Sequence, residues 1–349
     1  MNRKYVLSAL VMTCIVLAPL GCTSNSGESE GPEPINIIKP VPDRAFQGFT
    51  PRSTVVYAGL QQNTYSKSGW DSWPDISLDG NYMAFTSSSQ TGNPDIYIKT
   101  VNGTTMSQKT TSTANDIQPA TSPNGKYIAF ASDRNGNYDI YVTSAWSNGP
   151  LWQVTSSKAD EASPSWSYDG TKLAYCAKNY SGEWELWTLD LSTQARTNLG
   201  PGMCPKWNPT TDVIAFQRPY KKEGLSCSIY TIDADGHNLN LIVRGERWAA
   251  IQPAWSPDGK RLAFAAASKS NWWKWWEKIE PLVKADDIYV ITIDGSQELR
   301  ITENSGSNWS PTWGMKDGIE RLYFTSDRDN HMNIWSVRMV KFSTAPEMP

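Results

Sequence analysis

The stretch Pro253–Ala266, PAWSPDGKRLAFAA, has the pattern of one β-hairpin. Two apolar runs flank Asp258 and Gly259, and glycine tolerates the positive φ that a tight hairpin turn requires. Related segments follow five other prolines, at spacings of 45, 45, 41, 48 and 58 residues along the chain. The six repeat prolines are Pro74, Pro119, Pro164, Pro205, Pro253 and Pro311. Six copies of one unit predict a repeat architecture.

A third apolar segment follows each hairpin, as in Asp287-Ile288-Tyr289. After five of these segments comes a further short run, such as Leu299–Thr302. The third segments begin at Asp95, Asp139, Glu185, Ser228, Asp287 and Asn333. Four strands in a repeated unit of about 45 residues are typical of a β-propeller. The sequence therefore predicts an all-β, six-bladed β-propeller with four-stranded blades.

The sixth unit lacks an outer strand of its own, because residues 340–349 show no clear strand pattern. The segment 53–58, STVVYA, is a lone strand that precedes the first repeat. If it pairs into the last blade, it closes the ring and removes two exposed sheet edges. The expected propeller domain spans residues 46–349. Its blades are expected at 74–113, 114–158, 159–200, 201–246, 247–304, and 305–340 together with 53–58.

Two forms of the repeat, Ser256–Phe264 (SPDGKRLAF) and Ser132–Tyr141 (SDRNGNYDIY), resemble the WD-like repeats of the TolB-type propeller family. The resemblance covers roughly residues 54–339, and it is specific for fold rather than function, because such blades also occur in peptidases and sugar lyases. We expect no counterpart of the N-terminal α/β domain of TolB. TolB binds a peptidoglycan-associated lipoprotein at its propeller, so the resemblance implies a protein partner.

The N-terminal residues have the pattern of an export signal: Arg3 and Lys4 precede a mainly apolar run, which ends before Gly21 and Cys22. Residues 1–21 resemble a bacterial lipoprotein signal peptide, which implies lipidation of Cys22. The alternative is a Cys placed by chance at the end of an apolar run.

Residues 22–45 are rich in Ser, Gly, Glu and Pro, which predicts a flexible tether. We expect an exported protein, anchored through Cys22 to the cell envelope, in the periplasm or at the outer membrane. The 32 basic and 35 acidic residues are well mixed. A basic stripe for phosphate contacts is therefore lacking, and nucleic acid is excluded as a partner. Three cysteines remain in the expected propeller, Cys176, Cys204 and Cys227, and we interpret them as buried, inert thiols, of which two at most form a disulfide.

The segment Asn271–Lys284, NWWKWWEKIEPLVK, holds four tryptophans. At 100° per residue, Trp272, Trp275 and Trp276 fall on one apolar stripe, which predicts a short helical insertion at 271–284. Three exposed indoles would present about 450–750 Å², as much as the largest apolar patch of a typical monomer. Three interpretations stay open: the helix packs on the propeller, it lines a ligand groove, or it docks into lipid headgroups.

Other indoles are expected on the same face of the propeller, where successive blades connect. They are Trp70, Trp73, Trp248 and Trp309, which precede repeat prolines. By contrast, the tryptophans two residues after a repeat proline are expected to pack between blades, since aromatic residues at a structural repeat usually pack. These are Trp166, Trp207, Trp255 and Trp313.

Acidic residues accompany the connecting face: Asp71, Asp116 and Glu161 each lie three residues before a repeat proline. One interpretation is that they bond local backbone amides in Asx turns. The other is a half-ring of carboxylates at the channel mouth that binds a divalent cation or a basic ligand group. Asp133-Arg134 and Asp327-Arg328 are expected to form turns and to pair between blades.

Hydrolase chemistry finds little support, because residues 46–349, the expected propeller domain, contain no Gly-x-Ser-x-Gly elbow. His237 and His331 are expected on opposite faces, so the histidine-rich metal site of the propeller lyases is not expected. Our leading hypothesis is a non-catalytic envelope protein, without a cofactor, that binds a peptide, a protein partner or a glycan on its Trp-rich face. The alternatives are a carbohydrate-active or peptide-processing enzyme with a carboxylate or cation site, and a scaffold subunit of an envelope complex.

Overall fold

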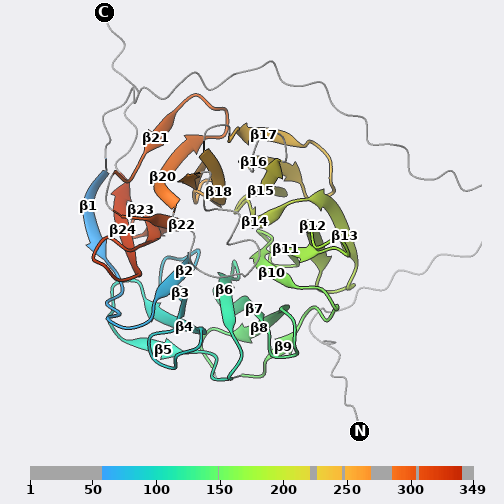
Figure 1. Ribbon diagram of the computed structural model, residues 1–349, viewed down its shortest axis with the longest axis horizontal. Coiled ribbons are helices and arrows are strands. Elements are labelled where there is room, and N and C mark those ends of the chain that lie inside the picture. Colours follow the sequence, from blue (N-terminus) through green and yellow to red (C-terminus); the bar gives the residue numbers. More distant parts are fainter. Residues whose placement is uncertain are drawn as a thin grey trace, which may run out of the picture. The chain divides into compact units, whose positions relative to one another are not determined.

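The computed structural model describes residues 57–147, 149–220, 226–245, 248–268, 285–303 and 306–339. All of them belong to the unit that spans residues 48–349. They form six antiparallel sheets of four strands each, arranged around a central channel (Figure 1). The predicted six-bladed β-propeller with four-stranded blades is confirmed.

Each blade has an inner strand, two middle strands and an outer strand. The inner strands are β2 (Asp71–Ile76), β6 (Asp116–Thr121), β10 (Glu161–Trp166), β14 (Met203–Trp207), β18 (Trp248–Trp255) and β22 (Asn308–Lys316). The second strands are β3 (Tyr82–Ser87), β7 (Tyr127–Ser132), β11 (Lys172–Lys178), β15 (Val213–Tyr220), β19 (Arg261–Ser268) and β23 (Ile319–Ser326). The third strands are β4 (Asp95–Thr100), β8 (Asp139–Ser144), β12 (Trp184–Asp190), β16 (Ser226–Asp233), β20 (Ala285–Thr292) and β24 (Asn333–Met339). The outer strands are β5 (Met106–Gln108), β9 (Trp152–Gln153), β13 (Arg196–Pro201), β17 (Asn240–Val243), β21 (Glu298–Arg300) and β1 (Tyr57–Gln62).

Strand β1 closes the ring. It pairs antiparallel with β24 in a sheet of order β1-β24-β23-β22, so the first described strand completes the sixth blade (Figure 1). The register joins Tyr57 to Met339 and Gln62 to Trp335. The predicted closure is therefore confirmed, with a strand that extends to Gln62, and residues 53–56 lie outside the described residues.

The predicted helix at 271–284 also lies outside the described residues, as do the predicted signal peptide, Cys22 and the tether. Within the described ranges, no helix has the length and apolar character that a membrane crossing requires.

One aromatic side chain of each second strand fills the centre of its blade. These residues are Phe85, Phe130, Tyr175, Phe216, Phe264 and Phe324, each with at most 1% of its surface exposed. In four blades this ring packs on an aromatic ring of the third strand, at centroid distances of 5.8–6.1 Å. Burial of such large side chains is the main favourable term that holds the blades together.

The residue before each repeat proline has a left-handed backbone in all six blades. Their φ angles lie between 47° and 56°, at Trp73, Gln118, Ser163, Cys204, Gln252 and Ser310. Each inner strand has a β-bulge at this point, where its register with the second strand shifts. A bulge re-aims the side chains that follow it. The residues after the prolines thereby come to line the channel.

Candidate functional site

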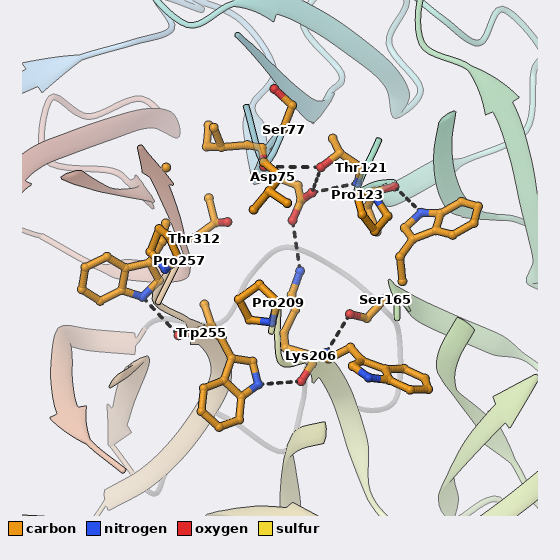
Figure 2. A pocket seen from close by; sticks show the side chains of 18 of the residues that line it. Asp75, Ser77, Thr121, Pro123, Ser165, Lys206, Pro209, Trp255, Pro257 and Thr312 are labelled. Atoms are coloured by element: carbon orange, nitrogen blue, oxygen red, sulfur yellow. Dashed lines mark hydrogen bonds and ion pairs between the residues drawn. The ribbon is translucent and has the colours of Figure 1, made fainter. Parts of the chain in front are cut away.

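We call the face that bears the turns between first and second strands the turn face, and the opposite one the inter-blade face. A cavity of about 140 Å³ opens at the channel mouth on the turn face. Its walls are the ends of the inner strands and the turns that follow them (Figure 2). We refer to this cavity as the turn-face hollow.

An ion pair crosses the turn-face hollow. Asp75 and Lys206 each follow a repeat proline, in blades 1 and 4, which lie opposite each other in the ring (Figure 2). The Lys206 Nζ atom lies 3.3 Å from Asp75 Oδ1. The other carboxylate oxygen, Oδ2, accepts hydrogen bonds from the backbone N and the Oγ1 atom of Thr121, at 2.8 and 2.7 Å. Asp75 is therefore fixed to blade 2, and its remaining oxygen faces the channel axis.

The tryptophans of the inner strands wall the hollow and link neighbouring blades. The Nε1 atoms of Trp166, Trp255 and Trp313 donate to backbone oxygens of the preceding blade at 2.9–3.1 Å. The acceptors are Ala120, Lys206 and Ala254, each the residue after a repeat proline. Trp207, Trp255 and Trp313 have 5–8% of their surface exposed. The predicted packing role of these residues is confirmed, and their place around the hollow was not foreseen.

An apolar collar surrounds the hollow. It consists of the fourth residue after each repeat proline, one from every blade: Leu78, Pro123, Tyr168, Pro209, Pro257 and Met315. Leu78, Tyr168 and Met315 are exposed by 52%, 44% and 41%. Sequence reasoning missed the collar, although the recurrence of an apolar residue just ahead of the turn was a usable signal.

The sequence-predicted tryptophans occupy the opposite end of the inner strands. Trp73 and Trp309 are 8% and 3% exposed, and Trp309 Nε1 donates to Ser72 Oγ at 3.2 Å. Trp70 packs edge to face on Trp73, with 5.8 Å between ring centroids.

Trp248 lies in blade 5, stacked on Phe264 and Tyr289 at 5.8 and 6.0 Å. Trp272, Trp275 and Trp276 lie outside the described residues. A ligand-binding role for this set stays a prediction.

The predicted acidic residues are buried at the start of the inner strands. Asp116 is fully buried, and both of its carboxylate oxygens accept from Arg134 Nη2, at 2.9 and 3.1 Å. In blade 6, Arg328 Nη2 donates to Asn308 Oδ1 at 2.9 Å in the same way.

The two Asp-Arg motifs were expected to form turns and to pair between blades. The turns are present, at Asp133–Gly136 and Asp327–Asn330. The pairing prediction is wrong for Arg134, which binds Asp116 of its own blade and stands 4.8 Å from the ring of Tyr141. The second strand ends beside the start of its own inner strand, so the nearest carboxylate lies in the same sheet.

Asp71 and Glu161 lie at different blade junctions. Asp71 Oδ2 accepts from Ser66 Oγ at 2.7 Å, and burial raises the pKa of Asp71. Glu161 Oε1 lies 3.7 Å from Arg196 Nη1. Burial and a hydrogen bond to Glu161 raise the pKa of Asp139 to about 7. Cation binding by Asp71, Asp116 and Glu161 stays a prediction, and among the described residues no three His, Cys, Asp or Glu side chains are arranged to hold a metal ion.

The three cysteines are free thiols. Cys176 and Cys227 are buried, and Cys204 is partly buried. Burial raises the pKa of Cys176 to about 11, which keeps it protonated near neutral pH. This fits the interpretation of inert thiols.

Comparison with known proteins identifies the fold family. Residues 53–238 match the model of the TolB beta propeller domain. The chain belongs to the TolB β-propeller family. It is 37% identical over 81 residues to the Tol-Pal system protein TolB of Thioalkalivibrio sulfidiphilus, a match that covers 23% of this chain and 15% of that protein. The chain thus matches only a small part of this relative's length.

Solved structures of this family and of other propellers share the fold. A putative TolB from Agrobacterium tumefaciens superposes with a TM-score of 0.56 at 17% identity, over 78% of this chain and 91% of that one. An oligogalacturonate lyase from Vibrio parahaemolyticus superposes with a TM-score of 0.54 at 12% identity, over 81% and 94%. At these identities the likeness concerns the fold alone.

Proposed function

We propose that the protein is a non-catalytic binding protein of the cell envelope, which holds a segment of a partner protein at the mouth of its channel on the turn face. Export through the signal at 1–21 and anchoring by a lipid on Cys22 are part of the proposal. Membership of the TolB propeller family supports a binding or scaffold role. The protein named TolB belongs to a Tol-Pal system, which supports an envelope protein as the partner.

The apolar collar around the turn-face hollow is the observation that carries the proposal. Leu78, Tyr168 and Met315 are exposed by 41–52%, although they belong to three different blades and surround one opening. Apolar side chains gathered around a concave centre are typical of a site that receives another molecule. Protein partners use such a centre for their anchoring side chains.

A protein partner fits the hollow better than a glycan does. Sugar rings stack on exposed indole faces, whereas Trp207, Trp255 and Trp313 are 5–8% exposed and packed between blades. The Nε1 atoms of Trp255 and Trp313 donate to backbone oxygens, and that of Trp207 has no hydrogen-bond partner. Three of the four indoles that line the hollow therefore offer their edges rather than an open face for stacking.

Site-specific photocrosslinking distinguishes the turn face from the inter-blade face. A photoreactive phenylalanine analogue replaces Tyr168 of the apolar collar in one variant. In the control variant it replaces Tyr180, a fully exposed residue between β11 and β12 on the inter-blade face. We expect a discrete crosslinked adduct in intact cells from position 168 and none from position 180. Adducts from position 180 alone would support the Trp-rich inter-blade face instead and overturn our assignment.

A further inference from the structure

The floor of the turn-face hollow has one acid and one base among the side chains that line it, Asp75 and Lys206. They are 16% and 31% exposed, so water still reaches both. Asp75 is held in place by Thr121, whereas Lys206 ends a long flexible side chain. Whatever enters the hollow therefore meets a fixed carboxylate oxygen and an ammonium that can move.

The charge of the entering group decides whether both partners stay satisfied. A carboxylate that takes Lys206 draws the ammonium away from Asp75 and places two negative charges in one small space. An ammonium that takes Asp75 faces Lys206 in the same way. Each arrangement leaves one charge without its ionic partner in a space that the entering group closes to water, which is costly.

A primary amide offers both a donor and an acceptor. Its N–H₂ group can donate to Asp75 Oδ1 while its oxygen accepts from Lys206 Nζ, so each charged group exchanges its present contact for a hydrogen bond to the amide. The apolar edges of the surrounding indoles and prolines then cover the methylene groups of the same side chain.

The volume limits the entrant to a single side chain. A cavity of about 140 Å³ is smaller than the roughly 300–1,000 Å³ of a small-molecule site. Building on the proposed function, we propose that the hollow takes the side-chain amide of a Gln or Asn that projects from the partner protein, bridged between Asp75 and Lys206.

Capped amino acids provide a direct test with the full chain. The probes are the N-acetyl, N-methylamide forms of glutamine, glutamate, lysine and leucine, and the readout is the indole N–H signals of ¹⁵N-tryptophan-labelled protein. We expect the glutamine probe to bind about tenfold more tightly than the charged probes, as one hydrogen bond to a charged group predicts. Equal binding of all probes, tighter binding of the leucine probe, or no binding of the glutamine probe would overturn the amide assignment.

Two variants test whether the ion pair sets the preference. Lys206→Met leaves Asp75 unpaired and should shift the preference to the lysine probe, and Asp75→Asn leaves Lys206 unpaired and should shift it to the glutamate probe. If the ion pair only braces the structure, neither substitution changes the order of the probe affinities. Thermal midpoints show whether the variants are folded. If position 168 crosslinks a partner while all probes bind equally, the proposed partner site at the collar is supported and the amide assignment is wrong. If the amide preference holds but only position 180 crosslinks, the hollow is selective and the proposed function fails.

Discussion

Asp139 of blade 2 and Glu161 of blade 3 meet across the junction of the two blades, and each is 2% exposed. Asp139 Oδ1 and Glu161 Oε2 are buried and have no other hydrogen-bond partner, and a hydrogen bond between the two side chains raises the pKa of Asp139. Gln153 Nε2 donates to the second oxygen of Asp139 at 3.0 Å, and Arg196 lies 3.7 Å from Glu161. Asp139 therefore holds its proton to a higher pH than an isolated aspartate does, since its ionisation beside another buried carboxyl group is unfavourable.

The proton on Asp139 makes stability depend on pH. The pKa of Asp139 is about 7 in the folded protein against an ordinary value of 3.8, so the folded state binds more protons between these values. The contribution of Asp139 to the free energy of unfolding should therefore fall as pH rises through this window and be lowest above about pH 7. Asp139→Asn supplies a permanent donor to Glu161, so it should raise the thermal midpoint at pH 8 and change it little at pH 4.

Asp287 provides the matched control, because it lies near the start of β20 as Asp139 does in β8. Its carboxylate is compensated by Arg300 Nε at 3.0 Å and by Thr302 Oγ1 at 2.9 Å. Asp287→Asn should therefore lower the thermal midpoint at pH 8. A lower midpoint of Asp139→Asn at pH 8 would show that the two carboxyl groups do not repel each other.

The repeat made the fold predictable from sequence. Pro253, the Asp258-Gly259 turn and Phe264 have counterparts in the other repeats, so turn residues and hydrophobic spacing together predicted six hairpins. The lone strand, which ends at Gln62, was predicted to close the ring. Local turn chemistry and strand alternation act over few residues, which is why they can be recognised in one sequence.

The turn-face hollow was not predicted, because it is formed by residues far apart in the sequence, which no local sequence pattern relates to each other. Asp75 and Lys206 lie 131 positions apart, and they meet because blades 1 and 4, with two blades between them on each side, stand opposite each other in a six-bladed ring. Leu78 and Met315 resemble ordinary turn residues until the ring brings them to one opening. By contrast, Trp73 and Trp309 resemble surface residues by position, yet the ring packs them among buried neighbours.

The ion pair in which Arg134 Nη2 contacts both carboxylate oxygens of Asp116 should matter strongly for stability. Asp116 is fully buried, so Arg134→Met leaves an uncompensated buried charge and should reduce the free energy of unfolding by about 3 kcal/mol. Asp116→Asn recreates the Asn308–Arg328 contact of blade 6 and should cost less. Urea unfolding of both variants measures the difference. Equal losses would mean that the charge of Asp116 is already compensated by other groups.

The left-handed backbone of the residues before the repeat prolines predicts that a glycine substitution there can increase the free energy of unfolding. Ser310 has a φ of 47° and its Oγ atom has no hydrogen-bond partner, so Ser310→Gly removes backbone strain without removing a hydrogen bond. We expect a gain in the free energy of unfolding of up to about 1 kcal/mol, and a loss of similar size for Ser310→Val. Guanidinium unfolding measures both.

Gln118 is the control for this effect. Its φ is 56°, but its Oε1 atom accepts from the N and Oγ atoms of Ser163 at 2.9 and 3.0 Å. Gln118→Gly should therefore be destabilising, because a contact between two blades is lost. A gain in both glycine variants would show that the side-chain bridge adds little.

The ion pair in the turn-face hollow should add little to stability. Because Asp75 and Lys206 are partly exposed, Lys206→Met should change the free energy of unfolding by less than about 1 kcal/mol, and Asp75 keeps its two bonds from Thr121. Trp255→Phe removes the bond from Nε1 to the backbone oxygen of Lys206, which joins two blades at a site that is 8% exposed, and should cost more. If urea unfolding gave Lys206→Met the larger loss, the pair would be a structural brace across the channel. A small loss of unfolding free energy in Lys206→Met would support partner binding, rather than stability, as the role of the ion pair.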